Sequence, residues 1–453
     1  MTIDEAISKA KRIHFIGIGG SGMCPLAEIL HEQGYYLTGS DNNESDTLKR
    51  IRALGIPVTM GQKAENVDGA DMVVYTAALL PDNPELCAAK EKGIPTFERS
   101  KLFGYFTRKY GNCIGVCGTH GKTTVTSMLT HILYENNLDP SAVIGGKLPL
   151  TGTNGLVGKS DILVCEACEY KDTFLDLTPD ISVILNIDRD HMEYFKTLEN
   201  LKASFTKFAN MSTKCVIYNG DDENTADALK DVTNPKISFG TTSNCNYVAE
   251  NIGFHHGAYP YFDIYKDGEY LGDVTLSVPG SHNVLNALAA ITAAMYFGVT
   301  FEQCKKSVLT FKGAGRRFEY LGTYNGADII DDYAHHPAEL TVTLTAAKKL
   351  PYKRVWAVFQ PFTFSRTQMH LKAFAESLSI ADNVVLTEIM GSREVNTYGI
   401  KTEDLANEID GSVWFDSFEK IADYLKENIT EGDLVITLGC GDVYKIAKMI
   451  LNK

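Results

Sequence analysis

The sequence has no apolar run long enough to cross a lipid bilayer. The longest such run, from about Ala287 to Val299, is shorter than the roughly 18–20 residues that a transmembrane helix needs. The first residues, Met1 to Arg12, are polar and predict the start of a helix rather than a signal peptide. We therefore expect a cytoplasmic protein without membrane insertion.

Clusters of positive charge are also missing. The chain carries 43 lysines and arginines against 57 aspartates and glutamates, and its formal net charge is −14. This balance argues against nucleic acid or an anionic membrane as the main partner. An anionic substrate would need a local site built from glycine N–H groups, arginine and Mg²⁺.

A second C-x-x-C motif is absent. The ten cysteines are spread along the chain, most of them inside apolar runs, which is typical of reduced and buried thiols. The one C-x-x-C pair, Cys165 and Cys168, is compatible with half a zinc site or a redox pair, but it follows the strand-like segment Asp161–Val164. Between the two cysteines lies Glu166, which is the stronger candidate for a functional residue.

Low-complexity linkers and repeats are missing as well, and 453 residues are enough for about three domains. Alternating strand and helix patterns divide the chain into residues 1–109, 110–313 and 314–453. The predicted fold class is α/β, with Rossmann-like first and third blocks and a mixed sheet in the central block. The expected elements are strands at 35–38, 72–76, 94–97, 162–165, 181–186, 327–330, 354–359, 383–386 and 434–438, a β-rich region at 216–278, and helices at 125–134 and 281–297.

A glycine-rich loop joins the apolar run Cys113–Cys117 to a helical pattern that begins near Val125. A strand, such a turn and a helix together make a phosphate cradle, because backbone N–H groups and the helix N-terminus point at the anion. Lys122 adds a positive charge, which we expect on an exposed loop, and a threonine hydroxyl can reach Mg²⁺. The strict P-loop pattern has glycine where this chain has Val116, so the loop is a variant. Its residues are Gly118, Thr119, His120, Gly121, Lys122, Thr123 and Thr124.

Another glycine turn, the first along the chain, lies near the N-terminus. Gly17-x-Gly19-x-x-Gly22 follows a strand that begins at Arg12, and Asp41 lies at about the distance of the acidic residue in a dinucleotide fingerprint. The fingerprint alone would indicate NAD. The turn is also a general pyrophosphate binder, and the separate loop with Lys122 favours two nucleotide sites on one chain.

Two further motifs belong to the central block. Asp190 and His191 follow a buried strand at the edge where open α/β sheets bind ligands. His191 is a candidate to hold a divalent ion with Glu166, although for His191 taken alone a structural role in capping a loop is the preferred interpretation. Asn283 and Asn286 are three residues apart on one helix face, which suits the edge of a base, and helix capping is the alternative.

Three polar clusters follow or abut strand-like runs in the third block. They are Arg316–Glu319, Asp331–Pro337 and Phe359–Thr367. Two aspartates, a tyrosine and two histidines directly after Ile330 are not explained by surface solvation alone, so we place a ligand-binding edge here.

Taken together, these motifs resemble the Mur ligase family. The resemblance spans nearly the whole chain in family order. Its motifs are His14–Met23, Gly118–Thr124, Asp190–Met192, His282–Ala287, Arg316–Phe318, Asp331–Pro337 and Phe359–Thr367.

The resemblance implies three domains and ATP-dependent amide formation. The first domain would bind a UDP-sugar, the central domain ATP, and the third both ATP and an amino acid. The implied substrates are UDP-N-acetylmuramate, L-alanine and ATP, with Mg²⁺ as cofactor. L-Alanine would be joined to UDP-N-acetylmuramate through an acyl phosphate. We expect a monomer or homodimer that does not bind nucleic acid.

The resemblance also implies roles for particular residues. The implied catalytic residues are Lys122, His191, Arg317 and His335. ATP would contact Gly118, Thr119, His120, Gly121, Lys122, Thr123, Thr124, Asn283, Asn286, Arg317 and Asp332. The UDP-sugar would contact Gly19, Gly20, Ser21, Gly22 and Asp41, the amino acid Tyr333, His335 and Arg366, and the metal Thr123, Glu166 and His191.

The chain departs from the family pattern in three places. Cys168–Lys171 stand where the family usually has Asp-Glu-Ser-Asp, and Phe362–Phe364 where the alanine-adding members have His-Arg-Tyr. Ser204–Thr206 occupy the region in which several members carry a carbamylated lysine, so no such lysine is assigned. A family ligase that adds a peptide or another amino acid, an NAD-dependent oxidoreductase and a catalytically silent nucleotide-binding regulator remain alternatives.

Overall fold

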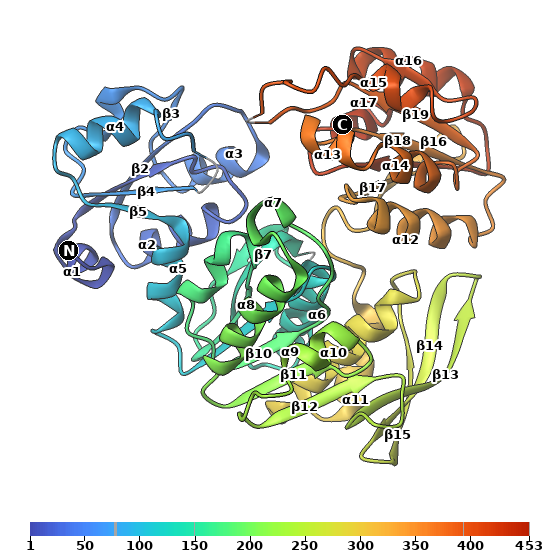
Figure 1. The fold of residues 1–453 in the computed structure, drawn as a ribbon, viewed down its shortest axis with the longest axis horizontal. Helices are drawn as coiled ribbons and strands as arrows, with labels where there is room; N and C mark the ends of the chain where they lie inside the picture. The colour runs from blue at the N-terminus through green and yellow to red at the C-terminus, as the bar shows by residue number, and fades with distance from the viewer. Residues whose placement is uncertain (77–78, 149, 393, 453) are drawn as a thin grey trace. The chain divides into compact units, whose positions relative to one another are not determined.

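The computed structural model describes residues 1–76, 79–148, 150–392 and 394–452. The chain forms two compact units. The first contains Met1–Glu250, Ile264–Gly272 and Leu285–Val308, and the second contains Asn251–Asp263, Asp273–Val284 and Leu309–Lys453. Three β-sheets, of five, ten and six strands, organise the described chain (Figure 1).

The first sheet is parallel, with strand order β3-β2-β1-β4-β5. Chain order reverses on either side of β1, and such a switch point is where open α/β sheets bind ligands. The strands are β1 (Arg12–Ile16), β2 (Tyr36–Asp41), β3 (Val58–Met60), β4 (Met72–Tyr75) and β5 (Thr96–Glu98). The helices are α1 (Ile3–Lys9), α2 (Cys24–Glu32), α3 (Asp46–Ala53), η1 (Ala64–Val67), α4 (Pro84–Glu91) and α5 (Arg99–Thr107).

The second sheet is mixed, with strand order β15-β14-β13-β12-β11-β10-β6-β9-β7-β8. Strand β6 pairs in parallel with β9 and β10, whereas β8 runs antiparallel to β7. The strands are β6 (Asn112–Cys117), β7 (Ser141–Leu148), β8 (Thr153–Leu156), β9 (Ile162–Glu166), β10 (Ile181–Ile184), β11 (Cys215–Asn219), β12 (Lys236–Gly240), β13 (Tyr247–His255), β14 (Tyr259–Lys266) and β15 (Glu269–Thr275). The helices are α6 (Lys122–Glu135), η2 (Tyr170–Asp176), α7 (Met192–Phe195), α8 (Leu198–Asn210), α9 (Glu223–Ala228), α10 (His282–Tyr296) and α11 (Phe301–Thr310).

The third sheet has strand order β16-β17-β21-β18-β19-β20, and only its edge pair, β16 with β17, is antiparallel among the described strands. The strands are β16 (Glu319–Tyr324), β17 (Ala327–Asp332), β18 (Arg354–Phe359), β19 (Asn383–Thr387), β20 (Val413–Phe415) and β21 (Asp433–Leu438). The helices are α12 (Pro337–Lys348), α13 (Phe364–Met369), α14 (Leu371–Leu378), α15 (Thr402–Ala406), α16 (Phe418–Asn428) and α17 (Tyr444–Ile450).

Alternate residues of β18 enter two separate cores. Ala357 and Phe359 pack in a cluster that includes residues of α12 and α14, whereas Trp356 and Val358 pack in one that includes residues of α16 and α17. Because successive side chains of a strand point to opposite faces, helices cover both faces of this sheet.

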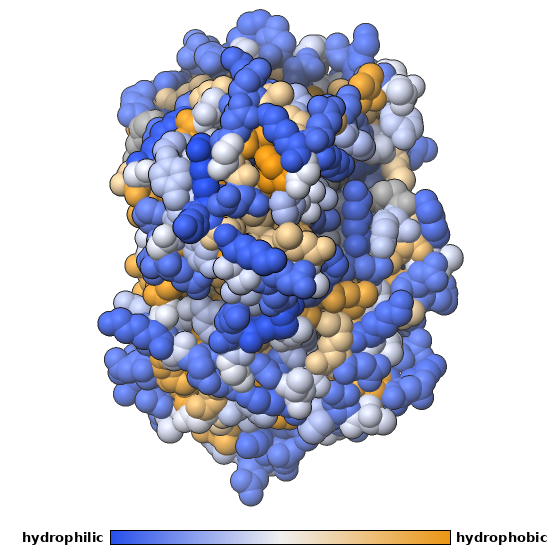
Figure 2. All heavy atoms as spheres, turned by 90° about the vertical axis from the view of Figure 1, so that its left-hand side faces the viewer, coloured by the Kyte–Doolittle hydropathy of each residue, from blue (hydrophilic) through white to orange (hydrophobic). Residues whose placement is uncertain are grey.

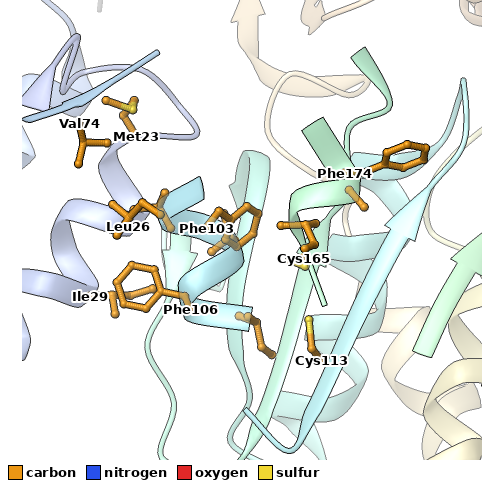
Figure 3. Close-up of a cluster of buried hydrophobic side chains, with 14 of the residues drawn as sticks. Met23, Leu26, Ile29, Val74, Phe103, Phe106, Cys113, Cys165 and Phe174 are labelled. Carbon is orange, nitrogen blue, oxygen red and sulfur yellow. The ribbon is translucent and has the colours of Figure 1, made fainter. Parts of the chain in front are cut away.

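The largest core of the first unit joins its two sheets. Leu26 and Ile29 of α2 and Phe106 of α5 belong to the same cluster as Cys165 of β9 and Phe174 of η2 (Figure 3). The first glycine turn, which precedes α2, and the end of β9 are therefore held by one continuous apolar core.

Most sequence expectations for the fold are confirmed. Each predicted strand corresponds to an observed one with small shifts at its ends, and the closing helix is α10. The strands β3, β7, β8, β16 and β20 were not predicted. Two of them, β3 and β20, have only three residues, which is too short for a periodic pattern to be read from the sequence. All ten cysteines lie in the described part of the chain and are free. The domain boundaries stay a prediction.

The face shown in Figure 2 is mostly hydrophilic, and its hydrophobic residues lie in separate groups. Among the described residues, no helix is both long enough and apolar enough to span a membrane.

Candidate functional site

The phosphate loop leaves the end of β6 and enters α6 at Lys122. Gly118 and Gly121 have φ values of 142° and 88°, which favour glycine. A Cβ atom on Gly121 would lie 2.6 Å from Oδ1 of Asn286. The backbone therefore turns sharply enough to expose the first N–H groups of α6, as a phosphate site requires.

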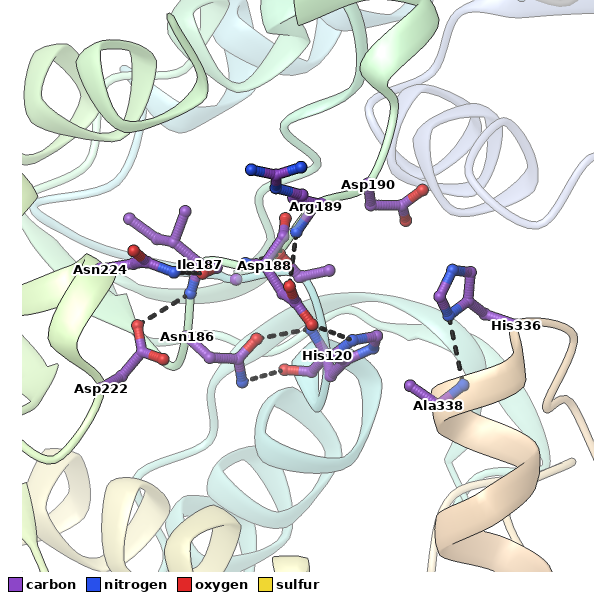
Figure 4. A network of polar contacts seen from close by, with 12 residues as sticks. His120, Asn186, Ile187, Asp188, Arg189, Asp190, Asp222, Asn224, His336 and Ala338 are labelled. Carbon is purple, nitrogen blue, oxygen red and sulfur yellow. Dashed lines mark hydrogen bonds and ion pairs between the residues drawn. The ribbon is translucent and has the colours of Figure 1, made fainter. Parts of the chain in front are cut away.

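A second loop, residues 186–188 after β10, holds the phosphate loop in place (Figure 4). The backbone N–H of His120 donates to Oδ1 of Asn186 at 2.8 Å, and Nδ2 of Asn186 donates back to the His120 carbonyl at 3.0 Å. The N–H of Asp188 donates to the Thr119 hydroxyl at 2.8 Å. Asn186 is thus a positioning residue that the sequence did not reveal, because it stood only as the last residue of the predicted strand 181–186.

Lys122 is not the exposed loop lysine that the sequence suggested. Its side chain is 17% exposed, and Nζ donates to the Gly118 carbonyl at 2.5 Å and to both carboxylate oxygens of Glu169 at 3.1 Å. Burial alone would lower the pKa of Lys122, but the negative charge of Glu169 raises it above its usual 10.5. The ammonium group therefore stays charged beside the loop.

Glu169 is a site residue that sequence reasoning missed. Its carboxylate is almost fully buried, and it lies three residues after the predicted Glu166. A buried carboxylate is costly without a cationic partner, so its place beside Lys122 is a specific feature of the site. The sequence signal was a second acidic residue just after the end of a strand.

Glu166 faces a cavity of about 320 Å³ in the first unit. Its Oε1 accepts a hydrogen bond from the N–H of Gly145 at 2.6 Å. The cavity is lined by Gly17, Gly20, Ser21, Gly22, Met23, Thr76, Arg99, Phe103, Val143, Ile144, Gly145, Glu166 and Cys168. The structure thus brings three predicted UDP-sugar residues, Gly20, Ser21 and Gly22, to the same space as Glu166.

The other two predicted UDP-sugar residues, Gly19 and Asp41, contact each other and do not line this cavity. The N–H of Gly19 donates to Oδ2 of Asp41 at 2.9 Å, and Oδ1 accepts from the N–H groups of Asn42 and Asn43 at 2.8 and 3.1 Å. In this structure Asp41 fixes the glycine turn through backbone contacts.

Arg99 supplies positive charge to the cavity. It is the first residue of α5, and its Nη1 lies 3.2 Å from the position that a Cβ of Gly22 would occupy. A side chain at residue 22 would therefore crowd the guanidinium group. Sequence reasoning missed Arg99 because it belongs to no glycine motif.

His191 has a strained backbone and a packed ring. Its φ is 56°, in the left-handed region that non-glycine residues rarely adopt. Its Nε2 lies 3.6 Å from Oδ2 of Asp190, and its ring centroid lies 4.7 Å from that of Tyr170. The orientation of the His191 ring is therefore set by Asp190 and by the ring of Tyr170.

The residues predicted to hold Mg²⁺ come from three segments. Thr123 lies in the first turn of α6, Glu166 ends β9, and His191 precedes α7. Within the described residues, no three His, Cys, Asp or Glu side chains converge into a metal cage. Mg²⁺ in nucleotide sites usually has one or two carboxylates together with substrate phosphates. The buried carboxylate of Glu169 beside the phosphate loop therefore makes the donor set suitable for this ion.

Asn283 and Asn286, predicted to address a base, lie three residues apart in α10 and are both almost fully buried. Nδ2 of Asn283 donates to the Pro279 carbonyl at 2.7 Å, and Asn286 packs against Gly121 as described above. Asn283 thus also stabilises the start of its helix, which was the alternative interpretation.

In the second unit, polar residues gather after the parallel strands of the third sheet. Arg316 joins three segments, because its Nε donates to Asp331 at 2.8 Å and its terminal nitrogens donate to the carbonyls of Gly439 and Gly441 at 2.7 and 3.1 Å. Arg316 therefore fixes the loop after β21, and Arg317 remains the candidate for substrate contact.

Asp332, predicted to contact the ribose, is engaged by the backbone. Its two oxygens accept from the N–H groups of Phe318 and Ala334, each at 2.8 Å. Burial raises the pKa of Asp332 to about 6, although the charge of Arg317 opposes that rise. The ribose assignment stays a prediction beside this structural role.

Tyr333, His335 and Arg317 lie close together. The guanidinium of Arg317 lies 5.2 Å from the ring centroid of Tyr333. Nδ1 of His335 lies 3.1 Å from the Tyr333 carbonyl and 3.2 Å from Oε2 of Glu339. Arg366 belongs to α13, whose preceding residue, Thr363, has a φ of 64°. The edge predicted from the sequence thus holds two arginines, a half-buried tyrosine and a histidine.

Comparison with known proteins agrees with this geometry. Residues 12–110 match the Mur ligase family catalytic domain, residues 116–294 the Mur ligase middle domain, and residues 316–441 the Mur ligase glutamate ligase domain. The chain therefore belongs to the Mur ligase family, and its fold is the three-domain α/β fold of that family.

Several relatives are similar over nearly their full length. The UDP-N-acetylmuramate–L-alanine ligase of Alkaliphilus metalliredigens is 43% identical, with 97% of each chain covered. The ligase of the same name from Agathobacter rectalis is 44% identical over 98% of this chain and 99% of its own. Among solved structures, the UDP-N-acetylmuramate–alanine ligase of Thermotoga maritima superposes with a TM-score of 0.85 at 27% identity, covering 97% and 98% of the two chains. A murein peptide ligase from Psychrobacter arcticus superposes with a TM-score of 0.78 at 25% identity, covering 98% of each.

Proposed function

We propose that this protein joins L-alanine to the lactyl carboxylate of UDP-N-acetylmuramate and converts ATP to ADP and phosphate, a step in making peptidoglycan precursors. The observation that carries the proposal is the full-length similarity, at 43–44% identity, to ligases of that name. The phosphate loop with its charged lysine supports the use of ATP.

The proposed reaction has two steps. The lactyl carboxylate attacks the γ-phosphate of ATP and forms an acyl phosphate, and ADP leaves. The amine of L-alanine then attacks the acyl carbon, and phosphate departs with formation of the amide bond.

Charge neutralisation is the main demand of the first step, because polyanions must approach each other. The N–H groups of residues 121–124 would bind the phosphates, because those of Thr119 and His120 already donate to Asn186. Lys122 would stabilise the negative charge that develops on the leaving oxygen. Mg²⁺, held by Thr123 with Glu166, Glu169 or His191, would supply further positive charge at the phosphate oxygens.

The cavity beside the first glycine turn suits the UDP-sugar. Ser21 and Gly22 would offer backbone N–H groups to the diphosphate, and Arg99 a guanidinium group, whereas the N–H of Gly20 donates to the Gly17 carbonyl within the turn. Glu166, on the same cavity, belongs to the sheet that carries the phosphate loop. A substrate seated there would lead from the first glycine turn toward the ATP site.

The amino acid would bind at the edge of the third sheet. Arg366 suits its carboxylate, because a planar guanidinium matches a carboxylate better than an ammonium does. Tyr333 and His335 would border the side-chain pocket, and Arg317 would stabilise charge on the transferred phosphate. We expect the protein to act in the cytoplasm as a monomer or homodimer.

Phosphate release is the direct test. ATP and UDP-N-acetylmuramate would be supplied with alanine, serine, glycine or a murein tripeptide, each in turn. We expect alanine to give the highest kcat/KM, and glycine to be lower by about 10- to 200-fold, because one methyl group is worth about 1–3 kcal/mol in an apolar pocket. Preference for the tripeptide would instead favour the activity named for the Psychrobacter arcticus neighbour. Hydride transfer with NAD and no phosphate release would overturn the proposal.

A further inference from the structure

Two loops that follow neighbouring strands of the third sheet are joined by backbone hydrogen bonds. One loop, residues 360–363, follows β18, and the other, whose described residues are 388–392 and 394, follows β19. Phe362 and Met390 form a parallel bridge. The N–H of Met390 donates to the Pro361 carbonyl at 2.9 Å, and the N–H of Thr363 donates to the Met390 carbonyl at 2.9 Å.

A side chain extends this connection into α13. Oε2 of Glu394 accepts from the backbone N–H of Ser365 at 2.9 Å, and Oε1 accepts from the Ser365 hydroxyl at 2.6 Å. The N–H of Glu394 in turn donates to the Gly391 carbonyl at 2.9 Å. Gly391 lies so close to the ring of Phe364 that an added Cβ would approach it to 2.4 Å. One carboxylate thus binds the second residue of α13 from a separate loop.

Helix α13 needs such support. It is six residues long, and helices this short are unstable without contacts outside themselves. It also starts after Thr363, whose positive φ is unfavourable for a β-branched residue. Arg366 follows Ser365 directly, so the direction of its guanidinium group depends on how firmly Ser365 is held.

We propose that Glu394 is a positioning residue for amino-acid recognition, which acts by fixing Ser365 and thereby the Arg366 guanidinium that binds the incoming carboxylate. The inference rests on the proposed function, since it needs Arg366 to contact the amino acid. Its consequence is specific: loss of Glu394 weakens the use of alanine and leaves the two nucleotide substrates unaffected.

The test is a set of steady-state measurements on the full chain, in which KM is determined separately for L-alanine, ATP and UDP-N-acetylmuramate. We expect Glu394→Ala to raise KM for alanine by about tenfold to a hundredfold, because small displacements of a binding group have effects of this size. KM for ATP and for UDP-N-acetylmuramate should change less than about twofold.

Conservative variants keep the test informative if Glu394→Ala folds poorly. The amide oxygen of Glu394→Gln can still accept from the Ser365 N–H, so its increase in KM for alanine should be smaller. Ser365→Ala keeps the backbone bond to Glu394 but removes the hydroxyl, which contacts Glu394 and, at 3.4 Å, Thr363, and it should also give a smaller increase. Glu376→Ala, at an exposed glutamate of α14, is the matched control and should leave all three KM values unchanged.

Arg366→Lys separates the inference from the function on which it rests. If Arg366→Lys raises KM for alanine and Glu394→Ala does not, the inference is overturned and the proposed site stands. If Arg366→Lys has no effect, Arg366 does not bind the amino acid and both assignments fall, while alanine-dependent phosphate release still reports on the overall reaction. In the double variant, Glu394→Ala should add less than about twofold to the KM of Arg366→Lys, because coupled residues are not additive. Full additivity would show that Glu394 acts by another route.

Discussion

Two glycine turns in the first unit expose backbone N–H groups at the end of a parallel strand, yet they obtain their positive charge differently. The turn after β6 contains its cation, Lys122, which is also the first residue of α6. The turn after β1 contains none, and the cation beside it is Arg99, from the separate helix α5. A local motif can therefore be complete in itself or depend on tertiary structure for half of its chemistry.

A buried glutamate stabilises each turn, and here too the two differ. Glu169 forms an ion pair with Lys122 and favours its charged form. Glu85 accepts a hydrogen bond from the Ser40 hydroxyl at 2.6 Å, and the Ser40 carbonyl accepts from the N–H of Gly17 at 2.8 Å. In the turn after β6 the buried carboxylate pairs with Lys122 itself. In the turn after β1 it holds Ser40, whose backbone carbonyl accepts from Gly17 of the turn.

The largest effect on activity should come from removing Lys122, the cation of the turn after β6. We expect Lys122→Ala to lower the rate of phosphate release by about a thousandfold, because a charge is lost from the phosphoryl-transfer site. Since the substitution leaves Glu169 buried without its partner, the melting temperature should also fall. Adding Glu169→Gln to Lys122→Ala should restore stability but not activity. Lys230→Ala, at an exposed lysine, is the control, and near-normal turnover of Lys122→Ala would remove the loop from the mechanism.

The second prediction concerns Arg99, the cation that α5 places beside the turn after β1. Arg99→Met should raise KM for UDP-N-acetylmuramate by about ten- to a hundredfold, as expected for the loss of a charged hydrogen bond worth about 1.5–3 kcal/mol. KM for ATP should change little, because Arg99 lies on the cavity of the first turn. Arg108→Met, just after the same helix, should leave both constants unchanged. An equal rise in both KM values would show that the two turns do not bind separate substrates.

The comparison also shows how far the sequence predicts the site. The α/β order of elements, the phosphate loop and the first glycine turn were all predictable, because strands, glycine turns and helix starts leave local patterns. Glu169 was missed because the preceding acidic residue, Glu166, fitted the pattern equally well. Arg99 and Glu394 were missed for a different reason. Each acts on a segment distant in sequence, and such contacts depend on which strands become neighbours in the sheet.

Local chemistry also cannot reveal which role a polar residue takes. Asp41 and Asp332 were predicted to contact substrates, yet in the structure both accept backbone N–H groups and shape their loops. An aspartate after a strand suits either role, because the same oxygens accept from a ribose hydroxyl and from an amide. Only the position of neighbouring N–H groups distinguishes the two.

The third prediction compares one glycine of each turn. Gly121→Ala should lower stability by about 1–3 kcal/mol, because φ is 88° and its Cβ would meet Asn286 at 2.6 Å. Gly20→Ala should cost less than about 0.5 kcal/mol, since the nearest atom to its Cβ would lie at 3.4 Å. Thermal unfolding of the two variants tests the difference. Equal losses would mean that both turns are under similar steric constraint.

The smallest effect concerns the buried carboxylate beneath the first turn. Burial raises the pKa of Glu85, but the contact with His14 and the hydrogen bonds from Ser40 and Asn66 outweigh it, so the pKa lies below its usual 4.5. A lowered pKa means that the ionised group stabilises the folded state above about pH 4.5, and that this contribution is lost as pH falls through the folded-state pKa.

Glu85→Gln should therefore lower the melting temperature at pH 7 by a few degrees, as expected for about 1–2 kcal/mol. The difference in melting temperature from the unsubstituted protein should narrow as pH falls from about 4.5 through the folded-state pKa of Glu85, because protonation then leaves both proteins with an uncharged side chain at this position. Glu91→Gln, at an exposed glutamate of the same helix α4, should show no such convergence. If the melting temperature of Glu85→Gln stays below that of the unsubstituted protein by the same amount from pH 7 to pH 3.5, the shape of the side chain, and not its charge, supports the first turn. Glu85 would then support its turn by shape, whereas Glu169 acts through its charge, which pairs with Lys122.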